Sequence, residues 1–146
     1  MSEQYSIEER CPTVEEYRSI CASVGWEGVI NFEAAAGSLA RSLYGVVALH
    51  NGEAVGMGRI VGDGYIYFYF QDIAVKREHQ GNGIGRQLLN RMMRYMQEHA
   101  PDQAFAGIFA SSEGMRLYER CGFRREPGLT GMFRVMTAAR NLEEGR

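Results

Sequence analysis

The segment Gln80 to Gly85, with the sequence QGNGIG, has the composition of an anion-binding loop. It follows a long apolar stretch and precedes an amphipathic helical pattern, so we expect it to join a strand to a helix. Glycines allow positive φ and close approach of a ligand, which leaves several backbone N–H groups free to converge on one anion. A pyrophosphate spreads its charge over many oxygens and matches such an array of donors. The loop is therefore a candidate pyrophosphate site.

Three other interpretations compete for this loop. It is not a Walker loop, because no Lys-Ser or Lys-Thr follows the last glycine. It does not match a dinucleotide-binding fingerprint, because the glycine spacing differs and no acidic residue lies at the appropriate strand end about 20 residues on. An ordinary glycine-rich turn remains an alternative, and the strand-to-helix context is the observation that discriminates against it.

The composition argues against several other kinds of site. The 146 residues carry a formal net charge of -2, which provides no basic field to gather nucleic acid. The three cysteines have no Cys-x-x-Cys spacing and the three histidines are scattered, so neither a disulfide framework nor a metal site is expected. No run approaches the roughly 20 apolar residues of a membrane helix, and Met1 to Arg10 lacks the apolar core of a signal peptide. We expect a cytoplasmic protein with no nucleic-acid or membrane partner.

The N-terminal third of the chain predicts two helices. Thr13 with Glu16 has the form of a capping box, and apolar residues then recur at helical spacing as far as Val24. After a break at Gly25 to Gly28, an alanine-rich stretch predicts a second helix from Asn31 to Ser42.

Strand patterns follow these helices. Turns at Asn51-Gly52 and Gly62-Asp63-Gly64 separate three predicted strands, which span Val46 to Leu49, Ala54 to Val61 and Tyr65 to Val75. The third strand carries nearly consecutive aromatic residues, which suggests burial on both of its faces.

Beyond the glycine-rich loop, apolar residues recur every four positions from Ile84 to Met96 and predict a helix that ends before Pro101. A short strand from Ala104 to Ala110 would then lie parallel to the strand that precedes the loop.

The C-terminal part predicts one more helix and two strands. Ser111 or Ser112 is expected to cap a short helix that ends at Arg120, with Gly122 as its left-handed C-terminal cap. The remaining predictions are final strands at Phe123 to Arg125 and Met132 to Thr137, and a solvated tail from Ala138.

Two motifs in this order resemble those of the GCN5-related N-acetyltransferases, the GNAT family. The segment from Gln71 to Gly85 resembles motif A, whose loop has Gln or Arg, two residues, Gly, one residue and then Gly or Ala. That pattern is filled by Gln80, Gly83 and Gly85. Leu117 to Phe123 is similar to the Tyr-Glu-x-x-Gly-Phe element of the family. The order of the predicted helices and strands agrees with that of the family from Thr13 to Thr137.

The resemblance implies a single domain over residues 1–146 with a core at 13–137 and a tail at 138–146. The implied fold is mixed α/β (α+β), with a twisted, mostly antiparallel sheet flanked by helices. A splayed parallel strand pair would form the acyl-CoA cleft between Ile73 to Val75 and Ala106 to Phe109.

The family binds acetyl-CoA along this strand and loop. Its pantetheine arm pairs with the strand backbone, and amides after the strand hold the pyrophosphate. In this sequence the resemblance places the following residues against acetyl-CoA: Ile73, Ala74, Val75, Gln80, Gly81, Asn82, Gly83, Ile84, Gly85, Arg86 and Ser111. Ser111 departs from the family pattern, because many members have Asn there and serine replaces only part of its hydrogen bonding.

Tyr118 matches the tyrosine that protonates the leaving thiolate of CoA in many family members. A phenol with a pKa of about 10 can donate a proton to a thiolate, whose thiol has a pKa of about 8.5, as the carbon–sulfur bond breaks. The alternative interpretation is a buried aromatic residue that covers its helix. The flanking motif favours the catalytic role.

The residue that accepts a proton from the acceptor amine is less well defined. Asp72 lies on the strand that holds the cofactor, although it could instead cap or pair with a neighbour. Tyr69 and Gln71 occupy places where some members hold a base or a water. Trp26 and Glu27 lie where the family builds its acceptor pocket, although an exposed loop carboxylate is an equal interpretation of Glu27.

We therefore predict an N-acetyltransferase that moves acetyl from acetyl-CoA directly to a primary amine of a small molecule, without a metal. Cys121 is not expected to act as a nucleophile, because no histidine lies near it in sequence. A peptide or protein lysine or N-terminal amine is the alternative acceptor, and a non-catalytic acyl-CoA sensor is the alternative class. The family habit also suggests a homodimer.

Overall fold

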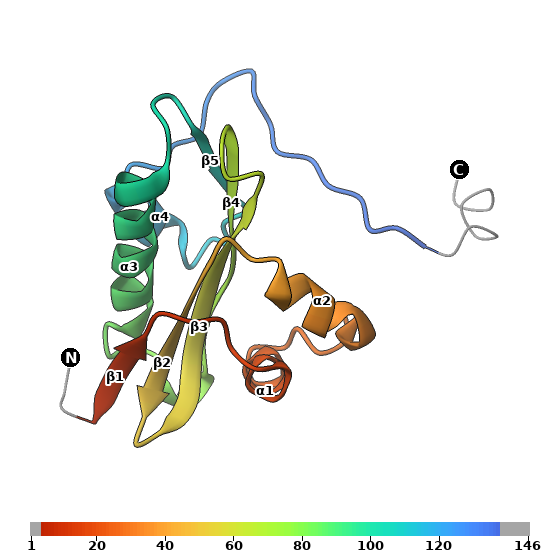
Figure 1. Ribbon diagram of the computed structural model, residues 1–146, viewed down its shortest axis with the longest axis vertical. Coiled ribbons are helices and arrows are strands. Elements are labelled where there is room, and N and C mark those ends of the chain that lie inside the picture. The colour runs from red at the N-terminus through yellow and green to blue at the C-terminus, as the bar shows by residue number, and fades with distance from the viewer. Residues whose placement is uncertain (1–3, 138–146) are drawn as a thin grey trace.

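The computed structural model describes residues 4–137 and contains a five-stranded sheet with helices on both faces (Figure 1). The strands lie side by side in chain order and are β1 (Tyr5–Glu8), β2 (Tyr44–His50), β3 (Glu53–Gly62), β4 (Tyr67–Val75) and β5 (Phe105–Ile108). Neighbouring strands are antiparallel except β4 and β5, which are parallel. The predicted mixed α/β fold, with its parallel pair, is confirmed. The tail predicted from Ala138 lies outside the described residues.

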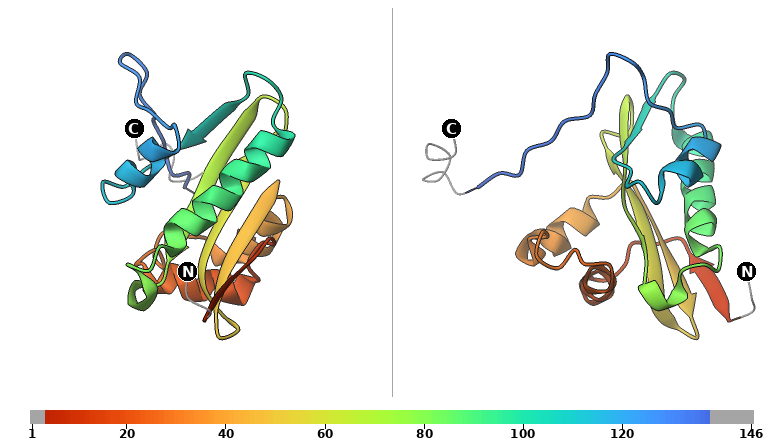
Figure 2. Two further views of the ribbon diagram at one scale, coloured as in Figure 1. Left: turned by 90° about the vertical axis from the view of Figure 1, so that its left-hand side faces the viewer. Right: turned by 180° about the vertical axis from the view of Figure 1, so that it is seen from behind.

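The helices pack on the two faces of the sheet (Figure 2). They are α1 (Val14–Ser23), α2 (Ala35–Ala40), α3 (Ile84–His99) and α4 (Met115–Arg120), with single 3-10 turns η1 (Phe32–Ala34) and η2 (Arg77–His79). The predicted capping box of α1 is confirmed, because the Thr13 hydroxyl accepts from the Glu16 N–H and the Glu16 carboxylate accepts from the Thr13 N–H. The second predicted helix begins as η1, capped by Asn31, and continues as α2.

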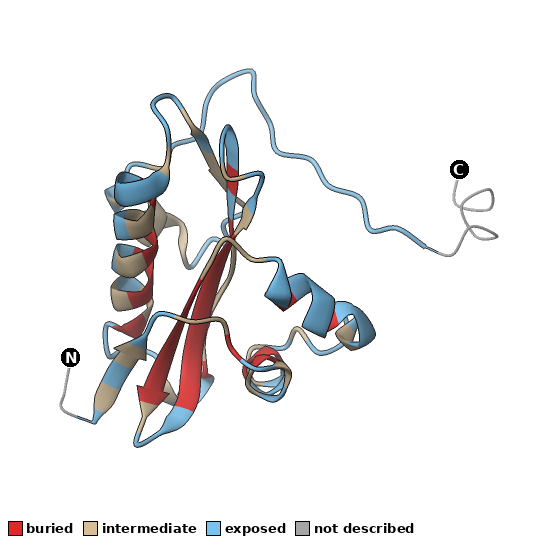
Figure 3. Cartoon of the chain, viewed as in Figure 1, coloured by how far each residue is buried: buried red, intermediate tan, exposed pale blue. Residues whose placement is uncertain are grey.

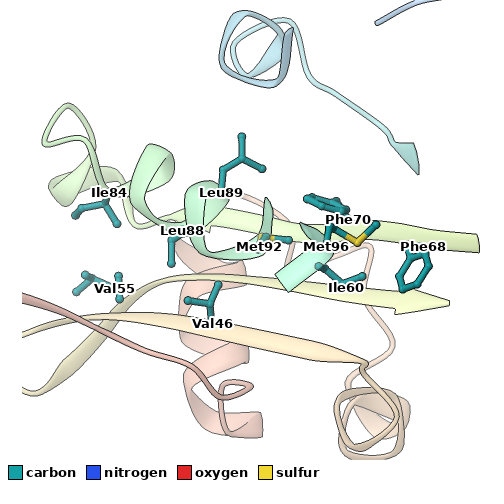
Figure 4. Close-up of a cluster of buried hydrophobic side chains, with 11 residues drawn as sticks. Val46, Val55, Ile60, Phe68, Phe70, Ile84, Leu88, Leu89, Met92 and Met96 are labelled. Atoms are coloured by element: carbon teal, nitrogen blue, oxygen red, sulfur yellow. The ribbon is translucent and has the colours of Figure 1, made fainter. Parts of the chain in front are cut away.

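The core lies on both sides of the sheet (Figure 3). One face packs against the apolar side of α3, and Figure 4 shows this cluster, with Leu88 and Met92 of α3 lying over the strands that carry Val46 and Phe70. The other face packs against α1 and α2 through Tyr17, Ile20, Leu39, Val47 and Met57. Gly58 allows α3 to approach β3 closely, since a Cβ there would lie 2.7 Å from the Met92 sulfur.

The long aromatic strand differs from its prediction in two respects. It begins at Tyr67 rather than Tyr65, because the Asp63 carboxylate accepts hydrogen bonds from three successive backbone amides and holds residues 63–66 as a turn. Only alternate residues are buried, with Phe68 and Phe70 inside and Tyr67 55% exposed. The expectation of burial on both faces was therefore wrong for the first half of β4, whose second face is covered by no helix of the described chain.

One strand was missed, and two further predictions were wrong. β1 was not predicted, because its alternation of apolar and polar residues covers only four positions; it is an edge strand that pairs with β2 alone among the described strands. No serine side chain caps α4, which begins after Gly114; Ser111 instead accepts the Gly114 N–H at 3.3 Å, ahead of the helix. The two final strands are absent from the described residues, where the segment from 123 to 137 forms one isolated bridge, between Glu126 and Leu129.

Candidate active site

A β-bulge at Asp72 divides β4 into two halves. Arg59 of β3 lies opposite Gln71, whereas Met57, two residues earlier in β3, lies opposite Ala74, three residues later in β4. β4 therefore contains one extra residue, and Asp72 takes a φ of 59°. The extra residue shifts the alternation, so that Ile73 and Val75 join Phe70 on the α3 side while Ala74 packs beneath α1.

The two parallel strands separate at this bulge. Pairing between β4 and β5 ends at Phe70 and Ile108, but β4 continues to Val75. Within residues 4–137, the edge of β4 over residues 71–75 therefore has no neighbouring strand on its β5 side. A cleft of about 710 Å³ opens at this place, between the second half of β4, the glycine-rich loop and the start of α4.

Most of the predicted acetyl-CoA residues line this one cleft. From the prediction it brings together Ile73, Ala74, Val75, Gln80, Gly81, Gly83, Ile84, Gly85, Ser111, Tyr118 and Trp26. The cleft lining also includes residues that the prediction missed: Val24, Arg77, His79, Ser112, Glu113, Gly114 and Leu117. The sequence did contain a signal for two of these residues, because the basic residues Arg77 and His79 immediately precede the loop.

The glycine-rich loop presents unbonded amides to the cleft. Gly81 and Gly83 have φ of 84° and 76°, a left-handed conformation that glycine adopts without strain. Gly83 precedes α3 without a side-chain cap, and the first amide with a backbone acceptor is that of Gln87. Among the described residues, no protein acceptor meets the N–H groups from Gly81 to Arg86. These amides and the N-terminal end of the α3 dipole form an anion-binding cradle.

Hydrogen bonds from the side chains of Gln80 and Asn82 hold the loop in place. Gln80 donates to the Val75 carbonyl at 2.9 Å and so ties the loop to the end of β4. Asn82 does not line the cleft, because its side chain turns to the His79 carbonyl at 3.0 Å and the Tyr5 hydroxyl at 3.4 Å. The Tyr5 hydroxyl also lies 2.9 Å from Nδ1 of His79. The side chain of Asn82 therefore shapes the loop, while its N–H remains available to a ligand.

Tyr118 projects from α4 into the cleft beside Gly114. A Cβ on Gly114 would lie 2.8 Å from Cε2 of the Tyr118 ring, so the ring can occupy this place only over a glycine. Burial raises the pKa of the Tyr118 phenol above its ordinary value. The phenol is therefore fully protonated at neutral pH and able to act as an acid.

The predicted acceptor residues do not all reach the cleft. Trp26 lines it, but Glu27 is exposed in the turn after α1 and lies outside the lining. Tyr69 stacks on Phe109, with ring centroids 6.2 Å apart and an interplanar angle of 6°. Gln71 follows on β4 at the point where the two strands part, and it is also outside the lining.

Asp72 is engaged by other side chains. Its Oδ2 accepts from Arg59 Nε at 2.6 Å and from the Tyr17 hydroxyl at 3.2 Å, and its side chain is 12% exposed. Burial and the charge of Asp72 raise the pKa of Tyr17, which keeps that phenol protonated as a donor. The remaining donors of Arg59 bond to Ser38 and Ser42. This network ties α1 and α2 to the bulge, and it favours a structural role for Asp72.

Within residues 4–137, no three His, Cys, Asp or Glu side chains come together in a way that could hold a metal ion. None of the helices described in this range has the length and apolar character needed to cross a membrane.

The chain is similar in sequence and in fold to proteins described as acetyltransferases. The family model for an acetyltransferase (GNAT) domain matches residues 41–125. A protein of unknown function from meticillin-resistant Staphylococcus aureus, named as a probable acetyltransferase, superposes with a TM-score of 0.84 at 28% identity, covering 90% of this chain and 99% of that chain. A GNAT-family acetyltransferase from Streptococcus pneumoniae superposes with a TM-score of 0.74 at 25% identity, covering 90% and 98%.

Two plant proteins are also similar in sequence. The histone acetyltransferase TAP1 of Glycine max is 27% identical over 131 residues, which cover 82% of this chain and 56% of the relative. A chloroplastic GCN5-related N-acetyltransferase of Arabidopsis thaliana is 31% identical over 80 residues, which cover 54% of this chain and 30% of the relative. The chain thus matches about half or less of the length of these curated relatives.

Proposed function

Because this chain belongs to the GNAT family of acetyltransferases, we propose that it transfers acetyl from acetyl-CoA to a primary amine of a small molecule. The observation that carries this proposal is the convergence on one cleft of free loop amides, an unpaired strand edge and the Tyr118 phenol. In this proposal residues 1–146 act as one catalytic domain, and the enzyme works as a cytoplasmic homodimer.

Each part of the cleft has a role in this proposal. The amides from Gly81 to Arg86 bind the pyrophosphate, and the free edge of β4 at Ile73 to Val75 pairs with the pantetheine arm as a further strand would. The thioester then lies in the gap between the strands, on the side of Tyr118. Ser111 and Trp26 also line the cleft.

The chemical step is a direct transfer in a ternary complex. The amine nitrogen attacks the thioester carbonyl carbon, the carbon–sulfur bond breaks, and Tyr118 gives its phenolic proton to the leaving sulfur. The amine loses its proton to water, and the phenolate of Tyr118 is reprotonated from solvent. Cys121 takes no part, since it does not line the cleft.

A protein or peptide amine is the second candidate acceptor. The loop from Glu126 to Gly131 is exposed and does not cover the cleft, which leaves the acceptor side open. One curated relative of the chain is named a histone acetyltransferase. An open acceptor side suits an extended peptide as well as a metabolite.

Release of CoA thiol tests the function directly. Purified protein with acetyl-CoA is expected to release CoA faster when a panel of small primary amines is added than when lysine peptides or buffer are added. A preference for the peptides would move the proposal to its second acceptor class. Binding of acetyl-CoA with no amine-dependent release on either panel would indicate a sensor and contradict the enzymatic proposal.

Gly83→Ala is expected to weaken acetyl-CoA binding by about tenfold. The residue has a φ of 76° with no heavy atom within 4 Å of an added Cβ, so alanine strains the backbone by roughly 1–2 kcal/mol and crowds a bound phosphate. Isothermal titration gives the Kd. Gly52→Ala is the matched control, because Gly52 has a φ of 84° and equally open surroundings in the β2–β3 turn. Equal loss with acetyl-pantetheine, which lacks the pyrophosphate, would contradict the assignment.

Gly114→Ala is expected to lower kcat by about tenfold without changing the Kd of acetyl-CoA. The added Cβ meets the Tyr118 ring at 2.8 Å, so the ring must shift away from its place in the cleft. Gly37→Ala in α2 is the control, since the nearest atom there is a flexible arginine end at 3.7 Å. If Gly114 acts by positioning Tyr118, the substitution should have no further effect on kcat in a Tyr118→Phe background.

A further inference from the structure

Three polar rings, those of Tyr5, His50 and His79, cluster beside the glycine-rich loop. Tyr5 and His50 lie directly opposite each other on β1 and β2, with ring centroids 4.8 Å apart. The His79 ring, from η2, packs against the His50 ring with centroids 4.7 Å apart and meets the Tyr5 ring edge-on at 5.8 Å. This cross-strand pair therefore supports the ring of a residue that lines the cleft.

The hydrogen bonds around the Tyr5 hydroxyl fix the direction of its proton. Asn82 Nδ2 lies 3.0 Å from the carbonyl oxygen of His79, and a carbonyl oxygen can only accept, so this end of the Asn82 amide is the donor. The same Nδ2 also donates to the Tyr5 hydroxyl oxygen at 3.4 Å. Because that oxygen accepts from Asn82, the single proton of the phenol is free for Nδ1 of His79, at 2.9 Å. Tyr5 is the donor in this bond, and Nδ1 is the acceptor.

A neutral histidine whose Nδ1 accepts a hydrogen bond carries its proton on Nε2. The two nitrogens lie on different sides of the ring, so Nε2 of His79 faces away from Tyr5, which is outside the cleft lining. Among the described residues, no acceptor lies within hydrogen-bond distance of this Nε2. His79 therefore has an N–H donor available to a ligand.

The surroundings of this donor suit an anion. The free amides of the loop begin two residues later, at Gly81. Arg77 also lines the cleft, and its Nε donates to the Ser23 carbonyl at 2.8 Å, which anchors a second cationic side chain beside the loop. Of the described residues that line the cleft, Glu113 alone is acidic.

We propose that Nε2 of His79 donates a hydrogen bond to a phosphate of acyl-CoA, and that Tyr5 is the positioning residue that keeps Nε2 protonated and directed to the cleft. This contact rests on the proposed function, because it requires acyl-CoA in the cleft. It adds a side-chain donor to the backbone cradle and gives the edge strand β1 a part in cofactor recognition. The pyrophosphate and the 3′-phosphate offer the same charged oxygens, and truncated cofactors distinguish them.

Isothermal titration with acetyl-CoA tests the His79 donor. His79→Asn keeps a polar group near the place of Nδ1 but cannot reach the place of Nε2, so it should weaken binding by about tenfold. His79→Gln puts an amide N–H near the place of Nε2 and should bring the Kd back to within about threefold of the unmodified chain. Neither variant should change the Kd of acetyl-pantetheine, which has no phosphate. A loss that disappears with dephospho-acetyl-CoA assigns the 3′-phosphate, and a loss that persists assigns the pyrophosphate.

Tyr5→Phe tests the positioning role. It removes the hydroxyl and keeps the ring that packs on His50, so acetyl-CoA binding should weaken by about threefold and acetyl-pantetheine binding should not change. In the His79→Asn background the same substitution should have no further effect. Tyr95→Phe and His99→Asn are the matched controls, because these two rings also pack together, with centroids 4.5 Å apart, but lie on α3 outside the cleft lining.

The tautomer of His79 has a spectroscopic signature of its own. Nitrogen-15 chemical shifts of the imidazole ring, measured at about pH 8.5 where an ordinary histidine is neutral, separate a protonated nitrogen from an unprotonated one. The signal that disappears in His79→Gln identifies the residue. The unliganded chain should carry the proton on Nε2, and Tyr5→Phe should give a mixture of the two tautomers.

An unchanged Kd of acetyl-CoA in His79→Asn, an equal loss with acetyl-pantetheine, or a proton on Nδ1 of His79 in the unliganded chain would each overturn the contact while the proposed function stands. A chain that binds no acetyl-CoA at all would remove the proposed function and the phosphate contact together. The nitrogen-15 spectrum of the unliganded chain would still report on the Tyr5–His79 bond, so the two failures are distinguishable.

Discussion

Replacing Tyr118 by Phe is expected to lower kcat by about 10²- to 10³-fold while the Kd of acetyl-CoA changes by less than about threefold. The substitution removes one oxygen from a ring that lines the cleft and is otherwise held by packing on Phe123. The lost proton donor matters when negative charge develops on the leaving sulfur, and it matters little while acetyl-CoA is bound. Steady-state kinetics and titration with acetyl-CoA separate the two effects.

The pH dependence sharpens this test. Only the protonated phenol can donate, so kcat should fall as Tyr118 ionises at alkaline pH. Because burial raises the pKa of Tyr118, this fall should begin at higher pH than for a free phenol, and the Phe variant should lack it. Tyr65→Phe is the matched control, since Tyr65 is 74% exposed at the distal β3–β4 turn. Unchanged turnover in Tyr118→Phe would remove the acid from the mechanism.

Tyr118→Phe also distinguishes a catalytic acetyltransferase from a non-catalytic acyl-CoA sensor. A sensor would bind acetyl-CoA, turn over no amine from a broad panel and show no functional loss in Tyr118→Phe. Failure with one amine alone would mean little, because enzymes discriminate strongly among similar substrates.

The sequence alone could locate the glycine-rich side of the cleft because its determinants are local. The left-handed glycines, the apolar strand before them and the amphipathic helix after them are consecutive, and each has a distinct composition. The N–H groups of the loop depend on no particular side chain, so a prediction of the backbone conformation was enough to predict where these groups lie. Tyr118 could be placed only because its flanking motif resembled a known family.

Other features depend on pairings that no local pattern contains. The bulge at Asp72 arises from the register between β3 and β4, and its partners Arg59 and Tyr17 lie 13 and 55 residues away in sequence. β1 has only four residues, and its strand conformation depends on its pairing with β2. The pattern at Met132 to Thr137 does favour a strand, but a strand requires a neighbour, and within one copy of the described chain the segment has none.

The ion pair of Arg59 and Asp72 gives the second large expected effect. Asp72→Asn should lower the free energy of unfolding by about 3 kcal/mol, because it leaves the Arg59 charge unpaired with its side chain 11% exposed. Asparagine is the informative replacement, since it tolerates the φ of 59° at this position, whereas alanine at that φ would strain the backbone. Urea unfolding followed by circular dichroism measures the loss.

A double-mutant cycle shows whether the loss belongs to the pair. Arg59→Met alone should cost a similar amount, because it leaves the Asp72 carboxylate buried with only the Tyr17 hydroxyl as donor. If the two single losses are added, they should overestimate the loss in the double variant by about 2 kcal/mol. Additive losses would mean that the two side chains stabilise the fold independently.

The kinetics of Asp72→Asn decide between a structural carboxylate and a general base. A base would lose kcat by about 10²-fold or more even where the protein remains fully folded, and the rate would no longer rise with pH on the acidic side. A structural carboxylate would instead lose activity together with folded protein, and Arg59→Met, which leaves the carboxylate in place, would lose it in parallel. We expect the parallel loss, because Asp72 lies outside the cleft lining and both Arg59 and Tyr17 already occupy its Oδ2.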